Sequence, residues 1–400
     1  MNAVRIVSTA IVACGCVALA WVLYGSVVPD DLALAPVDVD AVFGESLVDS
    51  AERYERFLYA DWALAELAVL AVLVVYARYG IRYVRESAAG PIGTGMLLGM
   101  LGLAFVWLAQ LPFAVAALWW DRRHGVSEVG YLEYVFGGWL ALGGTFVAVC
   151  LGLLIVMALA RWLGTWWWVP GVGVFTAIVA LLVFVGPYLA TDLERTDDPA
   201  LQRTYDRYAH AQGVGDIPLR VEEVSGDTSE ANAYAFGIGP SARVVLWDTL
   251  LDGRFDTGEV NVVVAHELGH HSSNHLKEAI GWFALFSLPG TLVLMLATLR
   301  RGGMGEPAAV PLALLVTAVF SLVAAPAQNV VSRHMEQEAD WKALQTTRDP
   351  ASARGLFREF ATTSLGDPSP PTWAYVMLQT HPTLAQRVAM ANAWTRRSGN

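Results

Sequence analysis

Seven long apolar runs constrain the fold of this chain more than any other feature of its sequence. They occupy, approximately, residues 6–28, 62–79, 94–120, 135–160, 166–189, 280–299 and 308–327. A helix needs about 20 mostly apolar residues to cross a bilayer, where every backbone polar group must be hydrogen-bonded within the chain. Apolar residues make up 55% of the sequence and charged residues only 16%, against about a quarter in soluble domains. We therefore predict a mostly α-helical, multi-pass integral membrane protein with a bundle of seven spanning helices.

The first run has an alternative interpretation as a signal peptide. Arg5 precedes it, and "ALA" at 18–20 is typical of a cleavage site. However, the apolar run is longer than the core of about 7–15 residues found in such peptides. We expect it to be a retained membrane anchor.

Charge and cysteine content exclude two classes of function. A net charge of −11 leaves nothing to neutralise phosphates, so we expect no nucleic-acid partner. The three cysteines, Cys14, Cys16 and Cys150, lie in apolar runs, which excludes a disulfide framework and a cysteine metal site. Only Lys277 and Lys342 are lysines among 26 basic residues, a bias that indicates a bacterial source with a GC-rich genome.

Two polar blocks divide the chain into four parts. We predict five spans with their loops in 1–190, a polar domain in 191–278, spans six and seven in 279–330, and a second polar part in 331–400. In the first block, "LRVEEV" and "ARVVLWDTLL" are β-rich runs separated by turn residues, which predicts a small sheet. Asp256 followed by Glu259 is typical of a helix start, so we expect a helix through residues 262–275.

That helix carries "VVVAHELGHHSSNH", which contains the pattern H-E-x-x-H. His266 and His270 are four residues apart, so both imidazoles project from one helix face and can bind one cation. Glu267 lies beside that face, close enough to deprotonate a water molecule on the metal. The spacing predicts one Zn²⁺ ion and a zinc peptidase.

A catalytic zinc site needs a third protein ligand. His275 misses by one residue the position that one class of zinc peptidase uses. The segment "SRHMEQEADWKAL" offers Glu336 as the ligand, with Asp340 four residues later as acceptor for the N–H of a ligand imidazole. Glu338 and His334 compete for the ligand position on spacing alone.

With "AHELGHH", "SRHMEQEAD" and "HPTLAQR" in this order, the chain resembles the integral-membrane zinc metallopeptidases of the CAAX prenyl protease type I family. The segments "LPFAVAALWWDRRHGVS", "NAYAFG" and "RVVLWDTLL" also resemble parts of that family. The resemblance implies seven helices that enclose a water-filled chamber, with a gluzincin-type α+β peptidase domain made of 191–278 and 331–400.

The resemblance also implies a role for each candidate residue. The zinc ligands would be His266, His270 and Glu336, with Glu267 as general base and Asp340 behind a ligand imidazole. Asn232 would contact the substrate backbone, His381 would help catalysis beside the bound peptide, and Arg387 would also bind substrate.

The function predicted is a membrane-embedded zinc metalloendopeptidase that cleaves membrane-associated or lipidated peptides. One alternative is a quality-control protease of the heat-shock type, which has fewer spans. Another is a transporter or scaffold with an inert zinc site, although two matching halves with broken helices, typical of transporters, are not evident.

Partners and location follow from the same reading. We expect a peptide or protein substrate, a lipid bilayer, and a monomer in a bacterial cell membrane. The resemblance places the active site toward the cytoplasm, whereas arginines in short loops slightly favour the opposite orientation.

Overall fold

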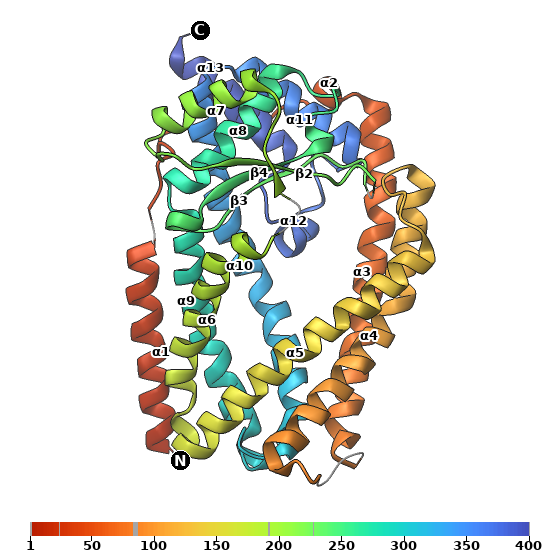
Figure 1. Cartoon of the computed structure of the whole chain (residues 1–400), viewed down its shortest axis with the longest axis vertical. Helices are drawn as coiled ribbons and strands as arrows, with labels where there is room; N and C mark the ends of the chain where they lie inside the picture. Colours follow the sequence, from red (N-terminus) through yellow and green to blue (C-terminus); the bar gives the residue numbers. More distant parts are fainter. Residues whose placement is uncertain (1, 24, 83–86, 191–192, 227, 400) are drawn as a thin grey trace.

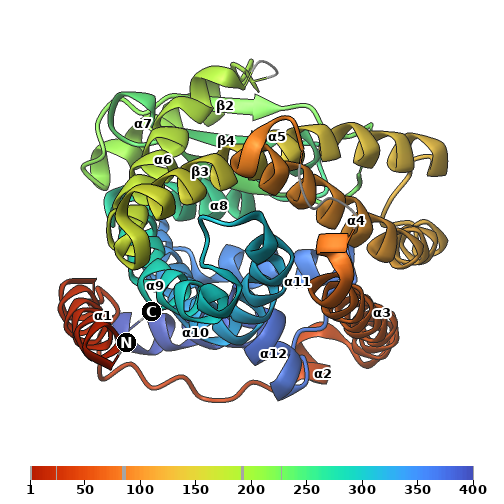
Figure 2. The same cartoon turned by 90° about the horizontal axis from the view of Figure 1, so that it is seen from below.

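The membrane part of the molecule is a closed ring of six helices. The computed structural model describes residues 2–23, 25–82, 87–190, 193–226 and 228–399. Within them, six helices are long and apolar enough to cross a membrane. They are α3 (Glu45–Tyr79), α4 (Gly90–His124), α5 (Tyr131–Leu163), α6 (Trp168–Leu189), α9 (His275–Thr298) and α10 (Val310–Thr347). Each packs against the next in this order, and α10 returns to α3 (Figure 1, Figure 2).

The first predicted span corresponds to helix α1 (Asn2–Leu23), which packs against α9 outside the ring (Figure 2). The helix ends five residues before the predicted end of the run, and the stretch Thr9–Ala18 is the apolar part found among its described side chains. The mostly helical membrane fold is thus confirmed, with six long helices in the ring and α1 beside it. The water-filled chamber stays a prediction.

The ring helix α10 extends well beyond its apolar run. The seventh run was expected to end near Pro326, but α10 continues through this proline to Thr347. Its 38 residues measure about 57 Å, nearly twice the hydrocarbon core of about 30 Å. A proline inside a helix removes one backbone hydrogen bond, and here the packing of α10 on α8, α9 and α3 stabilises both halves. The third-ligand segment is therefore rigidly joined to a membrane helix.

The polar part consists of a small mixed sheet and six helices (Figure 1). The strands are β1 (Leu193–Glu194), β2 (Leu219–Glu222), β3 (Ala233–Phe236) and β4 (Arg243–Trp247), in the order β1-β2-β4-β3. The helices are α2 (Val39–Phe43), α7 (Pro199–Ala211), α8 (Thr257–Ser272), α11 (Pro350–Ser364), α12 (Thr372–Leu378) and α13 (Leu384–Ser398). Short 3-10 turns lie at Gly80–Arg82, Gly164–Trp166, Gly239–Ser241, Asp248–Leu250, Leu299–Arg301 and Pro307–Ala309.

The predicted strands and helix start are confirmed. The central strand β4 is buried and β-branched, and it pairs parallel to β2 and antiparallel to β3. Helix α8 begins with the expected reciprocal bonds between Asp256 and Glu259. The apolar face of α8 packs with β4 and α11 in one core that includes Leu246, Val264 and Leu356. This core fixes the helix that carries the H-E-x-x-H pattern.

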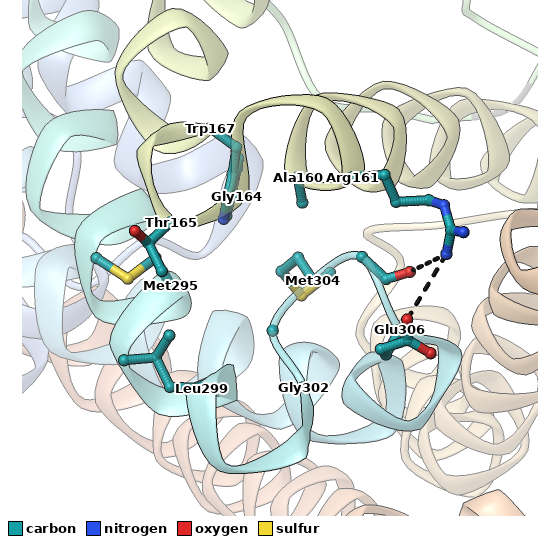
Figure 3. A pocket seen from close by; sticks show the side chains of 12 residues that line it. Ala160, Arg161, Gly164, Thr165, Trp167, Met295, Leu299, Gly302, Met304 and Glu306 are labelled. Carbon is teal, nitrogen blue, oxygen red and sulfur yellow. Dashed lines mark hydrogen bonds and ion pairs between the residues drawn. The ribbon is translucent and has the colours of Figure 1, made fainter. Parts of the chain in front are cut away.

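At the far end of the ring, a glycine-rich loop closes on the end of α5 (Figure 3). Arg161 donates to the carbonyl of Gly305 at 3.1 Å and pairs with the exposed Glu306 at 3.6 Å. A pocket of about 410 Å³ lies beside this pair. It belongs to the opposite end of the molecule from the residues singled out by the sequence analysis.

Candidate metal centre

Helices α8 and α10 approach very closely at the candidate site. At Gly269 of α8, an added Cβ would lie 3.1 Å from the Cα and 3.2 Å from the carbonyl oxygen of Ala339 on α10. A glycine therefore permits this approach. It allows the imidazoles of α8 to reach the carboxylate of Glu336.

The three predicted ligands converge on one point. The Nε2 atoms of His266 and His270 are 3.1 Å apart. Glu336 places Oε2 at 3.2 Å from His266 Nε2 and Oε1 at 3.5 Å from His270 Nε2. One ligand atom from each of these residues lies within 4.8 Å of the others, so the group is able to hold a metal ion. All three side chains are mostly buried.

The charge distribution favours a cation at this point. Burial opposes protonation of His266, but the hydrogen bond to Asp340 and the nearby carboxylate of Glu336 outweigh it and raise the pKa of His266 to about 10. Burial lowers the pKa of His270 to about 3, so that ring is neutral. The carboxylates beside His266 attract positive charge, whether a proton or a metal ion. Among the described residues, Glu336 Oε2 is buried yet accepts no hydrogen bond of acceptable geometry.

Behind His266 lies a buried ion pair. His266 Nδ1 is 2.9 Å from Asp340 Oδ1, as the spacing of Glu336 and Asp340 predicts. Arg387 of α13 binds the same carboxylate with two bonds, from Nε at 2.8 Å and Nη2 at 2.6 Å, and its guanidinium lies over the Phe357 ring. Burial opposes the charge of Arg387, but Asp340 outweighs it and raises the arginine pKa. Its main partner is thus Asp340, a contact that the sequence did not indicate.

Glu267 is buried beside the ligand group. The backbone N–H of Ala235 in β3 donates to its carboxylate. Burial raises the pKa of Glu267 to about 7, opposed by the nearby His266. A carboxyl group in this environment is able to exchange protons near neutral pH.

A cleft of about 540 Å³ opens beside these side chains. Asn232, Glu267, His381 and Arg387 line it, together with the apolar Phe360. His381 Nε2 is 3.3 Å from Glu336 Oε2, and its side chain is 55% exposed. Asn232 directly precedes β3, which is an edge strand of the described sheet.

The competing candidates for the third ligand face away from the ligand group. Glu338 bonds to His275 Nε2 at 3.0 Å, and His334 bonds to the carbonyl of Gly25 at 2.7 Å. The structure thus brings Glu336 to both imidazoles and selects it from the alternatives. The functional role of each site residue stays a prediction.

Comparison with known proteins decides the family. The sequence profile of peptidase family M48 matches residues 195–395, which include most of both polar blocks and every candidate site residue. The chain belongs to peptidase family M48. It is therefore a metallopeptidase, as predicted, and the inert transporter or scaffold is not supported.

Proteases from several organisms are similar to parts of the chain. An uncharacterized metalloprotease, YhfN, of Bacillus subtilis is 29% identical over 56% of this chain and 56% of its own length. A CAAX prenyl protease 1 homolog of Arabidopsis thaliana is 27% identical over 62% of each chain. A protease HtpX homolog of Tropheryma whipplei (strain Twist) is 26% identical over 63% of this chain and 88% of its own length. The matches thus span less than two thirds of the length of the first two relatives.

The fold of this M48 peptidase resembles a solved membrane structure. The crystal structure of S. mikatae Ste24p superposes with a TM-score of 0.75 and covers 97% of this chain and 98% of its own, at 16% sequence identity. The likeness extends over the helix ring as well as the polar part. The predicted multi-pass membrane fold is confirmed by it.

Proposed function

We propose that this chain is a zinc metalloendopeptidase, with one Zn²⁺ held by His266, His270 and Glu336. The observation that carries the proposal is the spacing of the ligand atoms. Two atoms bound at about 2.0–2.1 Å to a tetrahedral zinc lie about 3.3 Å from each other. Here the two imidazole Nε2 atoms are 3.1 Å apart, and each lies near one oxygen of Glu336: His266 is 3.2 Å from Oε2 and His270 is 3.5 Å from Oε1. The unsatisfied Glu336 Oε2 also fits a metal ligand.

The surrounding residues are arranged for peptide hydrolysis. Zinc, when bound, would supply a Lewis acid that polarises a carbonyl group and activates water. Glu267 would take the proton from the attacking water and pass it to the leaving amine. His381 lies at the open side of the ligand group and would donate to the developing oxyanion. Asp340, held by Arg387, would fix the orientation of His266.

The edge strand β3 would bind the substrate as an added strand. Its register with β4 leaves the other edge unpaired in the described sheet, and Asn232 stands where that edge meets the cleft. Binding through backbone hydrogen bonds gives recognition with little sequence choice. We therefore propose that Asn232 binds the substrate backbone. We also propose that Arg387 acts mainly through its contact with Asp340.

Membrane-associated or lipidated peptides are the substrates we propose. Glu336 lies on α10, a spanning helix, so the metal centre would lie close to the membrane. The structural similarity covers 98% of the Ste24p chain. Relatives named CAAX prenyl protease 1 homolog support processing of a lipidated carboxyl terminus. The peptidase domain is proposed to comprise 191–278 and 331–400, acting as a monomer.

A quality-control protease is the second candidate, since HtpX homologs match up to 88% of their own length. A farnesylated and an unlipidated form of one peptide separate the two functions. Preference for the farnesylated form supports the first, and equal cleavage of both supports the second.

The decisive test is Glu267→Gln in the purified full-length protein. Gln keeps the shape of the side chain but is not a base, so cleavage of a reporter peptide should fall by about 10²–10⁴-fold. Zinc content, measured by elemental analysis, should stay at one per chain. The exposed Glu223→Gln is the control and should match the wild type in both measurements. Cleavage that survives in Glu267→Gln would refute the assignment of the base.

The orientation follows the family resemblance, with the metal centre in the cytoplasm. Arginines at the far end of the ring, among them Arg82, Arg161 and Arg300, favour the reverse by the positive-inside rule. Labelling single-cysteine variants of a cysteine-free chain in intact cells decides between them. We expect an impermeant maleimide to label Glu306→Cys and not Glu223→Cys; the opposite pattern places the centre outside.

A further inference from the structure

The second imidazole of the metal centre has a support of its own, which differs from that of the first. His270 turns Nε2 toward His266 and Glu336, while its other ring nitrogen, Nδ1, lies 3.0 Å from Nδ1 of His275. His275 is 2% exposed and starts α9, a spanning helix. A ligand imidazole is held in place by the hydrogen bond of its other nitrogen. His275 occupies that position for His270.

A two-residue turn brings His275 back to His270. Helix α8 ends at Ser272 and α9 begins at His275. Asn274 between them has a left-handed backbone with φ of 60°, a conformation that asparagine tolerates better than most residues. In an unbroken helix, a residue five positions after His270 would point away from it. The turn between α8 and α9 instead lets His275 face His270.

The hydrogen bonds that link His270, His275 and Glu338 allow only one arrangement of protons when His270 binds a metal. If His270 offers the Nε2 lone pair to a metal, its proton sits on Nδ1 and is donated to His275. His275 Nδ1 must then accept, so its own proton sits on Nε2. That atom is 3.0 Å from Oε2 of the buried Glu338, which accepts it. Each link thus has a donor and an acceptor.

The far end of the chain is the segment after α1. The other carboxylate oxygen of Glu338, Oε1, accepts the backbone N–H of Val27 at 2.8 Å. One helical turn earlier, His334 Nε2 donates to the carbonyl oxygen of Gly25 at 2.7 Å. The residues that follow the N-terminal helix are therefore attached to the same face of α10 as Glu338.

We propose that His275 and Glu338 are positioning residues for the second metal ligand, and that the segment of residues 25–27 completes their hydrogen-bond chain. This proposal rests on the proposed zinc site. It assigns a role in metal binding to a histidine that is not a ligand and to a carboxylate that is not a ligand. It also connects the N-terminal helix to the metal centre.

The test measures zinc affinity directly, by competition with a chromophoric chelator on the purified full-length protein. His275→Phe keeps a ring of similar size but removes the acceptor, and should weaken zinc binding by about 10–100-fold. His275→Gln offers an acceptor and a donor on one amide and should recover most of the affinity. The absorption spectrum of the Co²⁺-loaded protein should change in His275→Phe and return toward the wild type in His275→Gln.

Two controls separate a specific effect from general damage. His271→Phe alters the neighbouring histidine, which bonds to the carbonyl of Arg243 instead of a ligand, and should bind zinc normally. Val27→Pro deletes the N–H that reaches Glu338, whereas Val27→Ala keeps it, so the proline variant should weaken binding and the alanine variant should not.

The outcomes distinguish this inference from the proposed function. Glu336→Gln removes a ligand, and zinc retained in that variant would refute the metal site itself. Zinc lost in Glu336→Gln but bound at wild-type affinity and with an unchanged Co²⁺ spectrum in His275→Phe would overturn the positioning role alone. Equal zinc affinities of Val27→Pro and Val27→Ala would show that the N-terminal segment is not part of the hydrogen-bond chain that supports His270. If His275→Phe does not fold, His275→Gln against Glu338→Leu gives the same comparison.

Discussion

The two imidazoles of the metal centre come from one helix, four residues apart, yet different parts of the protein support them. His266 is backed by Asp340 and then by the guanidinium of Arg387, a full cation. His270 is backed by His275 and Glu338, and the support ends on the neutral backbone N–H of Val27. The first support ends in the C-terminal polar part, and the second ends beside the N-terminal helix α1.

The difference in charge assigns different tasks to the two supports. A buried carboxylate paired with a buried guanidinium is costly to break, because the remaining charge is left without a partner. The support of His266 is therefore bound to the stability of the polar part. The support of His270 has one carboxylate, which accepts from the His275 imidazole and the backbone N–H of Val27, and its end lies on an exposed segment. It is better placed to adjust the geometry of the metal than to hold the fold together.

The largest effect on this comparison should come from Arg387→Met. The change leaves Asp340 buried without its cation and should lower the free energy of unfolding by about 3–5 kcal/mol. Thermal unfolding of the purified protein in detergent measures it. Arg397→Met in the same helix is the control, because the pair of Arg397 with Asp31 is exposed to solvent and should contribute little to stability. Equal losses in the two variants would contradict the stabilising task of the first support.

The sequence predicted the ligands better than it predicted their supports. The spacing of His266 and His270 follows from helix geometry, and that of Glu336 and Asp340 does too, so both pairs could be placed before the structure was known. The strands and the start of α8 were predicted for the same reason, because turn and capping residues act locally.

Features that depend on distant packing could not be predicted. Pro326 suggested the end of a helix, but α10 packs on neighbouring helices and continues through this proline to Glu336. The resemblance implies that Arg387 binds substrate, which stays a prediction, and nothing local in the sequence indicates that α13 places its guanidinium on Asp340. The sequence indicates His275 only as a candidate ligand. Its contact with His270 could not be predicted, because it depends on one left-handed residue between two helices.

The smallest effect should come from a change at Gly269, where α8, the helix that carries both ligand imidazoles, approaches α10. An alanine there would press on the backbone of Ala339, where its Cβ would lie at 3.1 Å from Cα. Because backbone atoms yield little, we expect Gly269→Ala to separate the helices slightly and to cost about 1–3 kcal/mol of stability. Gly152→Ala in α5 is the control, since an added Cβ there meets no atom within 4 Å and helix propensity favours alanine. Zinc affinity should fall in Gly269→Ala and not in Gly152→Ala. The Co²⁺ spectrum should also shift in Gly269→Ala, because the two ligand imidazoles move together with α8. A Gly269→Ala protein with wild-type stability and an unchanged spectrum would contradict the prediction, since it would show that the two helices can accommodate the added methyl group.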